Sequence, residues 1–433
     1  MTRSAIRFEH YNHPVISKLF KSSVPGEYRA NFIHLYFDMG WYGVLAGSSI
    51  NFLKIYAARL GGNGFQIGML DASAALVGLS LAIPAGHWIV KRHIGRTIFW
   101  TSVVYRIGFL LWVLLPWLFT YSGQVWALIV LAFLMAIPLT PLSVGFNALF
   151  AASVPDEYRA HVAGIRNILL SVSFILTSLG CGYLLEHLAF PTGYQFVFAI
   201  GFFGAAMSSL HLYFVRPLPV PADITQRPVE LKTAEDAASA HHGRTLFSAI
   251  RADIWSTHFR NVLLVMMGFH LAQYLALPLF PLYQVNQLHL TDEQIGNGSA
   301  IFYLIVLLGS TQLRAVVHKI GNRMVTAIGV IGMGFYPFIM AFSRTPLHFY
   351  GVSAMGGLSW ALVGGAYANY MLERIPAHDR PAYLAWYNVI LNASILTGSL
   401  LGPLIASQIG LVAGLFVFAA ARFLAGIAIW KWG

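Results

Sequence analysis

The stretch 60–68, LGGNGFQIG, returns 228 residues later as 288–296, LHLTDEQIG. Both copies begin with Leu and end with Gln-Ile-Gly, and Met39-Gly40 returns at the same offset as Met267-Gly268. The second half of the chain therefore repeats the first in the same order. A duplication of this kind predicts two structurally equivalent halves, with a functional site at the seam between them.

A second set of repeated residues lies at an offset of 221. Its members are Val154-Pro155, Arg159 and Asn167, which return as Ile375-Pro376, Arg380 and Asn388. The change of offset indicates that the two halves differ mainly by short deletions. We expect the two asparagines to cap helices or to contact loops.

Composition restricts the class of protein. Of 433 residues, 57% are hydrophobic and only 10% are charged, whereas soluble domains carry about a quarter charged residues. Apolar stretches long enough to cross a bilayer follow one another with short polar breaks. The single cysteine, Cys181, excludes a disulfide framework and a cysteine-based metal site, and no cofactor is expected.

The hydropathy pattern predicts an all-α integral membrane protein with twelve transmembrane helices in two six-helix bundles around a central cavity. The expected spans are 31–56, 65–90, 97–119, 124–150, 161–186, 193–215, 261–287, 295–317, 323–342, 347–372, 382–407 and 410–431. They define four units: an N-terminal segment 1–30, a bundle 31–215, a linker 216–260 with an amphipathic helix, and a bundle 261–433.

The distribution of basic residues predicts the orientation in the membrane. Most of the 27 Lys and Arg residues lie in the N-terminus, the long linker and alternate loops, while the opposite loops contain only Arg59 and Arg344. By the positive-inside rule, both termini and the linker are cytoplasmic, in a cell or plasma membrane. Orientation in the lipid bilayer, with basic residues on the cytoplasmic side, thus explains the net charge of +11, and we expect no nucleic-acid partner.

The loop after the second span reads Gly86-HWIVKRHI-Gly95-Arg96, and its repeat reads 318–323, HKIGNR. With the string 154–159, VPDEYR, these loops resemble those of the major facilitator superfamily, although Arg92 stands where the family has an acid. The resemblance covers nearly the whole chain and implies a secondary transporter. It assigns a gating role to six loop residues: Gly95, Arg96, Arg159, Gly321, Arg323 and Arg380.

Span eleven contains Gly398-x3-Gly402-Pro403, which is similar to a signature that the family's drug antiporters carry in span five. Close packing of helices through small residues explains the same spacing. Export is slightly favoured on this motif and on the aromatic residues of the spans. Uptake by a symporter or uniporter remains the alternative.

Span one offers Asp38, Trp41 and Tyr42 at spacing i, i+3 and i+4, hence on one face. A carboxylate in hydrocarbon costs on the order of 2.5–3.5 kcal/mol, so Asp38 is the candidate for proton coupling. The other interpretation is a structural ion pair with Arg106 of span three. Asp71 lies near the outer mouth of span two and is expected to be hydrated.

The resemblance implies that spans one, four, seven and ten line the cavity. Span seven contributes His270, Gln273 and Tyr274, and span ten contributes Trp360 and Tyr367. Aromatic and amide groups suit a small organic solute. Together with the three residues of span one, these form the predicted substrate site.

The sequence thus predicts a monomeric secondary transporter of a small organic solute that works by alternating access, with protons as a candidate coupling ion. The spans show no His, Asp and Glu spacing for a metal and no nucleophile–base pair, so we expect no enzyme. A non-transporting sensor or a membrane-embedded enzyme on the same scaffold is the alternative from another class.

Overall fold

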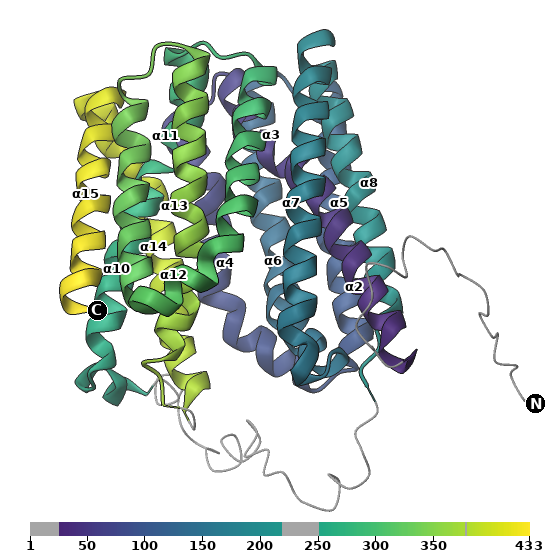
Figure 1. Ribbon diagram of the computed structural model, residues 1–433. Coiled ribbons are helices and arrows are strands. Elements are labelled where there is room, and N and C mark those ends of the chain that lie inside the picture. Colours follow the sequence, from purple (N-terminus) through teal and green to yellow (C-terminus); the bar gives the residue numbers. More distant parts are fainter. Residues whose placement is uncertain (1–25, 219–250, 377–378) are drawn as a thin grey trace, which may run out of the picture.

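The computed structural model describes residues 26–218, 251–376 and 379–433. In these ranges the chain consists of helices and short connections, without any strand (Figure 1). Nine helices there are long and apolar enough to cross a membrane. The predicted all-α, multi-span class is confirmed.

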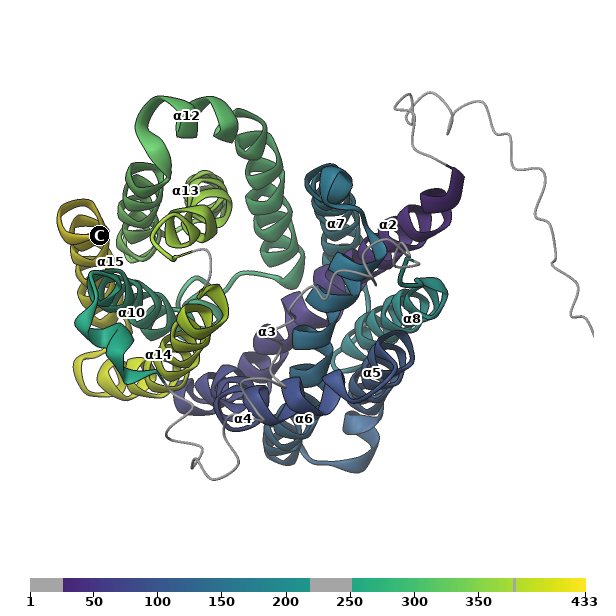
Figure 2. The same ribbon diagram turned by 90° about the horizontal axis from the view of Figure 1, so that it is seen from below.

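The helices form two groups, each from one half of the chain, which lie side by side (Figure 2). The N group comprises α2 (Gly26–Leu45), the π-helical η1 (Ala46–Ile50), α3 (Asn51–Arg59), α4 (Gly64–Val90), α5 (Ile94–Leu118), α6 (Tyr121–Ser153), α7 (Asp156–His187) and α8 (Thr192–Phe214). The C group comprises the 3-10 helix η3 (Ala252–Ser256), α10 (Phe259–Ala276), α11 (Leu279–Leu282), the π-helical η4 (Tyr283–Gln287), α12 (Asp292–Met340), α13 (Pro346–Leu372), α14 (Arg380–Ile409) and α15 (Leu411–Trp432).

The expected amphipathic helix of the linker lies mostly outside the described residues. Within them, Ile254 in η3 is fully buried and packs on the core of the C group. This part of the linker is therefore attached to the helices rather than free of them.

The repeated stretch that opens each half begins a helix in the same way. The Asn63 side chain accepts a hydrogen bond from the Gln66 backbone, and the Gln66 side chain accepts one from the Asn63 backbone. Thr291 and Gln294 form the same reciprocal cap at the start of α12. Each pair satisfies two backbone N–H groups that a helix start leaves unpaired, which explains why Gln recurs at this place.

One proline and one glycine interrupt the long helices of the C group. Helix α10 ends at Ala276, and Pro278 separates it from α11, because proline lacks the N–H that a helix requires. Gly321, with φ +80°, breaks α12 between the two spans expected there. A φ of this sign suits glycine, which has no Cβ to clash.

The two groups contact each other through α4 with α14 and through α7 with α12. These contacts are tight because glycine lies at both. A Cβ on Gly68 would lie 1.9 Å from the Ser399 carbonyl oxygen, and one on Gly296 would lie 2.7 Å from that of Ser178. The glycines that end the two repeated stretches therefore each abut a helix of the opposite group.

We name the two ends of the molecule by their connections. The turn end contains the turns 60–63 and 288–291, and Figure 1 shows α3 and α11 there. The linker end contains the start of α2, the end of α8 and the start of α10. The Gly68 and Gly296 contacts both lie towards the turn end.

Candidate substrate site

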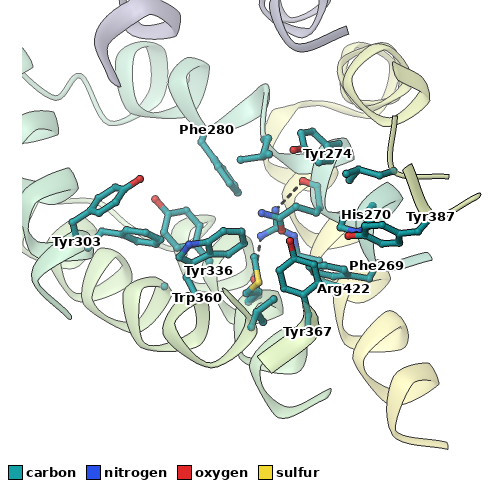
Figure 3. Close-up of a pocket in the computed structure, with 17 residues that line it drawn as sticks. Phe269, His270, Tyr274, Phe280, Tyr303, Tyr336, Trp360, Tyr367, Tyr387 and Arg422 are labelled. Carbon is teal, nitrogen blue, oxygen red and sulfur yellow. Dashed lines mark hydrogen bonds between the residues drawn. The ribbon is translucent and has the colours of Figure 1, made fainter. Parts of the chain in front are cut away.

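A cavity of about 470 Å³ lies inside the C group, between α10, α12, α13, α14 and α15 (Figure 3). Its wall is largely aromatic and includes Phe280, Phe302, Tyr303, Tyr336, Trp360 and Tyr387. A cavity of this size and character suits a small, partly apolar ligand, which aromatic side chains can hold by stacking.

Polar groups interrupt this aromatic wall, and two of them, His270 and Gln273, lie on α10. The Nε2 atom of buried His270 lies 2.9 Å from the Tyr387 hydroxyl oxygen. The amide oxygen of Gln273 is buried and has no hydrogen-bond partner within the described residues. An unpaired buried acceptor is costly, so a ligand donor at this position would be stabilising.

Arg422 of α15 also lines the cavity and is only 2% exposed. Its guanidinium donates to the backbone carbonyls of Met333, Gln273 and Ala272 at 3.1, 3.0 and 3.4 Å. The Met333 carbonyl needs such a donor, because Pro337 has no N–H to offer it. Arg422 therefore joins α15 to α10 and α12.

Two further cavities, each of about 550 Å³, lie at the seam between the groups. One is lined by α4, α6, α10 and α14 and shares Tyr274 with the first cavity. The other is lined by α7, α12 and α13 and shares Tyr303 and Trp360. The three cavities therefore adjoin one another.

The asparagines repeated at offset 221 belong to these seam cavities. Asn167 of α7 lines one of them, and Asn388 of α14 lines the other. Each lies well inside its helix, so the capping role, one of the two expected for them, is wrong. The repeat therefore places equivalent amides on equivalent cavities.

Asp38 lies inside the N group and lines none of the three cavities described. Its carboxylate lies 4.0 Å from the Arg106 guanidinium and 3.3 Å from that of Arg166, and it accepts a hydrogen bond from Ser208. All four side chains are buried. The buried carboxylate lies between two arginines and ties α2 to α5, α7 and α8.

The neighbours of Asp38 on α2 are not among the residues that line the three cavities. Trp41 packs edge-on against Phe203 of α8, with ring centroids 5.5 Å apart. Tyr42 packs on a hydrophobic core cluster that contains residues of both groups. The span-one part of the predicted site and the C-group part thus lie in different places.

A second ion pair lies at the seam itself. Lys54 of α3 contacts Asp71 of α4 at 2.6 Å, and both side chains remain about a fifth to a quarter exposed. Asp71 lines the seam cavity that includes Tyr274. Asp71 is therefore partly exposed, as expected, and it also has an ion-pair partner on the neighbouring helix that the sequence did not predict.

At the turn end, an ion pair crosses between the groups. Arg59 at the end of α3 lies 3.1 Å from Asp292 at the start of α12 and also donates to the Leu290 carbonyl oxygen. Nearer the middle, the rings of Phe174 and Tyr303 stack with centroids 3.8 Å apart. These contacts hold the groups together on the side away from the linker end.

The loop residues that the sequence assigns to gating have varied surroundings. Arg159 donates to the Val154 carbonyl at the end of α6, and Arg323 donates to the Gly433 carbonyl. Gly95 and Arg96 lie in the first turn of α5, and Arg380 begins α14. Gly321 forms the break in α12.

Five of the eight predicted site residues come together around the C-group cavity: His270, Gln273, Tyr274, Trp360 and Tyr367. Sequence reasoning missed Arg422 there, although a charged residue within a span is itself a signal. It also missed Arg166 beside Asp38, although Arg166 lies within the expected span 161–186, because the sequence does not show that α2 packs against α7 at this point.

A family model described as the Major Facilitator Superfamily matches residues 32–284 and 262–433. The chain belongs to the Major Facilitator Superfamily. It is therefore a membrane transporter and not an enzyme. This superfamily member is 25% identical over 305 residues to the cis,cis-muconate transport protein of Acinetobacter baylyi, covering 69% of this chain and 70% of the relative.

A shorter match, 28% identical over 179 residues, links it to the staphyloferrin B transporter of Staphylococcus aureus and covers 40% and 43% of the two chains. Among solved structures, the inward-open xylose transporter XylE from E. coli superposes with a TM-score of 0.65 at 15% identity, over 93% and 94% of the chains. The nucleoside transporter NupG superposes with a TM-score of 0.61 at 13% identity, over 93% and 98%. These superpositions show a shared fold.

Proposed function

We propose that this superfamily member carries a small organic solute across the membrane by alternating access. The observation that carries the proposal is the aromatic cavity around His270 and Trp360, which adjoins two cavities at the seam between the groups. A solute in this place would contact the C group while the N group moves past it. The relatives support this size class, since cis,cis-muconate and xylose are small organic molecules.

The membrane arrangement is part of the proposal. Twelve crossings result if α2 to α3 count as one and α12, broken at Gly321, counts as two. The boundaries 1–30, 31–215, 216–260 and 261–433 then separate two six-helix bundles from their cytoplasmic segments. With both termini cytoplasmic, the turn end faces outwards and the Arg59–Asp292 pair closes the outer side.

We propose that the molecule works as a monomer. We also propose that Asp71, rather than Asp38, is the carboxylate that couples transport to protons. Asp71 is partly exposed, lines a seam cavity and has one cationic partner, Lys54. Asp38 is buried and enclosed by two arginines. A carboxylate that exchanges protons during transport needs access to water, which favours Asp71.

The sequence favours export through the Gly398 and Gly402 motif, but packing accounts for that motif. A Cβ on Gly402 would lie 2.0 Å from the Leu275 carbonyl oxygen, and one on Gly398 would lie 3.1 Å from that of Leu271. Both glycines therefore allow α14 to approach α10. Export is retained as the proposed direction on the aromatic cavity, and uptake is the alternative.

The test is a thermal-shift screen of the purified protein against a metabolite and drug library, followed by flux in proteoliposomes. A solute that binds the folded state raises its apparent stability. We expect a stabilising solute to be transported, and the sign of its pH-gradient response gives the direction. A solute that stabilises the protein but never crosses the bilayer would favour the sensor alternative.

A further inference from the structure

The charge of Arg422 is not matched by any carboxylate in the described part of the chain. Its side chain is nearly fully buried, yet the salt bridges of the described residues do not include it. Its three hydrogen bonds go to uncharged backbone carbonyls. A guanidinium has five N–H groups and stays protonated in proteins, so both charge and donors remain available.

In the N group, by contrast, the buried arginines have a carboxylate beside them. There, Asp38 lies between Arg106 and Arg166 and neutralises part of their charge. At the repeat offset of 228, Asp38 corresponds to Met266 of α10, which is fully buried and apolar. The C group therefore keeps a buried arginine but has a methionine where the N group has the carboxylate.

The side of the cavity that Arg422 faces is suited to a flat, apolar group of a ligand. Phe280 lies under the guanidinium, with its ring centroid 5.4 Å from the Arg422 Cζ, and Trp360 and Tyr336 form other walls (Figure 3). The hydroxyls of Tyr274 and Tyr336 supply further donors on the same cavity. An arginine fork, hydroxyl donors and aromatic walls together match a carboxylate attached to an apolar, flat group.

We propose that the transported solute is an organic carboxylate whose anionic group pairs with Arg422 while its apolar body lies among Phe280, Tyr336 and Trp360. This inference rests on the proposed transport function. Occupancy of the cavity supplies the negative charge that Arg422 lacks among its neighbours. Arg422 thereby selects the charge of the solute and also ties α15 to α10 and α12.

The test compares acids with their uncharged amides on the purified wild-type protein. The probes are benzoate, trans-cinnamate and adipate, each with its carboxamide, together with a metabolite library sorted by charge. We expect the binding solutes to be carboxylates and each amide to bind at least about tenfold more weakly, because it loses the charge-assisted contact. Binding solutes that are only neutral or cationic, or the absence of any carboxylate among them, would overturn the inference.

Substitutions distinguish the binding of a carboxylate by Arg422 from its structural role in joining α15 to α10 and α12. Arg422→Lys keeps a cation for the backbone carbonyls but loses the bidentate fork, and Arg344→Gln, an exposed arginine at the turn end, is the matched control. We expect Arg422→Lys to weaken carboxylate binding about tenfold or more with a small change in Tm, and the control to change neither. Equal carboxylate binding by Arg422→Lys and the wild type would contradict the proposal. Flux of a neutral solute would sink the inference but leave transport intact, whereas binding without any flux would sink transport itself.

Discussion

Arg59 and Asp292 form an ion pair between the two helix groups, with 3.1 Å between Nη2 and Oδ1. Arg59 ends the first long helical segment of the N group, and Asp292 begins α12 in the C group. Both side chains are mostly buried. The pair therefore stabilises the arrangement in which the groups meet at the turn end.

We predict that Arg59→Gln shifts the equilibrium towards a state that is open at the turn end. The substitution removes an interaction made only when the groups meet there, and a shift follows from that difference. The measurement is the distance between spin labels at Ser122 and Leu347, both exposed at the turn end, in a Cys181→Ser background. Arg344→Gln is the control, and a distance distribution unchanged by Arg59→Gln would remove the proposed role of this pair.

Gly68→Ala should disturb the same contact by steric overlap. A Cβ there would meet the Ser399 carbonyl at 1.9 Å, whereas a Cβ on Gly86 of the same helix meets nothing within 4 Å. We expect Gly68→Ala to lengthen the label distance and to slow transport severalfold, while Gly86→Ala behaves as wild type. Equal behaviour of the two alanine variants would show that α4 and α14 do not approach this closely.

Asp38→Asn should destabilise the protein rather than alter binding directly. It leaves Arg106 and Arg166 buried without their carboxylate, and breaking a buried ion pair costs about 3–5 kcal/mol. We expect a much lower Tm and poor yield, measured by thermal unfolding in detergent. A stable Asp38→Asn protein that has lost only its pH-driven flux would instead restore Asp38 as the coupling carboxylate.

Asp71→Asn should abolish proton-driven transport while changing the stability of the protein little. Asp71 is partly exposed and pairs with Lys54 at the seam, so its loss costs little stability. We expect a Tm within a few degrees of wild type, loss of flux driven by a pH gradient, and retained exchange of solute across the bilayer. Normal pH-driven flux in Asp71→Asn would exclude it from coupling.

Local patterns predicted the fold well because the deciding interactions are local. The Gln-Ile-Gly repeat reflects a reciprocal cap and a buried isoleucine within the first turn or two of a helix, whereas its glycine contacts a helix of the opposite group. The break at Gly321 and the end of α10 before Pro278 likewise follow from backbone chemistry at single residues. The relative positions of the helices depend on contacts between residues that are far apart in the sequence, and local patterns do not predict them.

The site was predicted in part for the same reason. Spacing alone places His270, Gln273 and Tyr274 on one face of α10, and the structure brings that face to the cavity. Spacing does not reveal that Asp38 meets Arg166, since this depends on how α2 packs against α7. It also does not reveal that Arg422, from the last helix, reaches the same cavity as Trp360.

The most direct test of the account is solute counterflow in proteoliposomes, using a stabilising solute and three variants. Trp360→Ala and His270→Ala remove groups that line the cavity, whereas Phe99→Ala removes an aromatic group of α5 that packs on Tyr213. We predict saturable counterflow by wild type and Phe99→Ala, with Kd for the solute raised about tenfold or more in the two cavity variants. Counterflow with unchanged affinity in Trp360→Ala and His270→Ala would contradict the placement of the solute in this cavity.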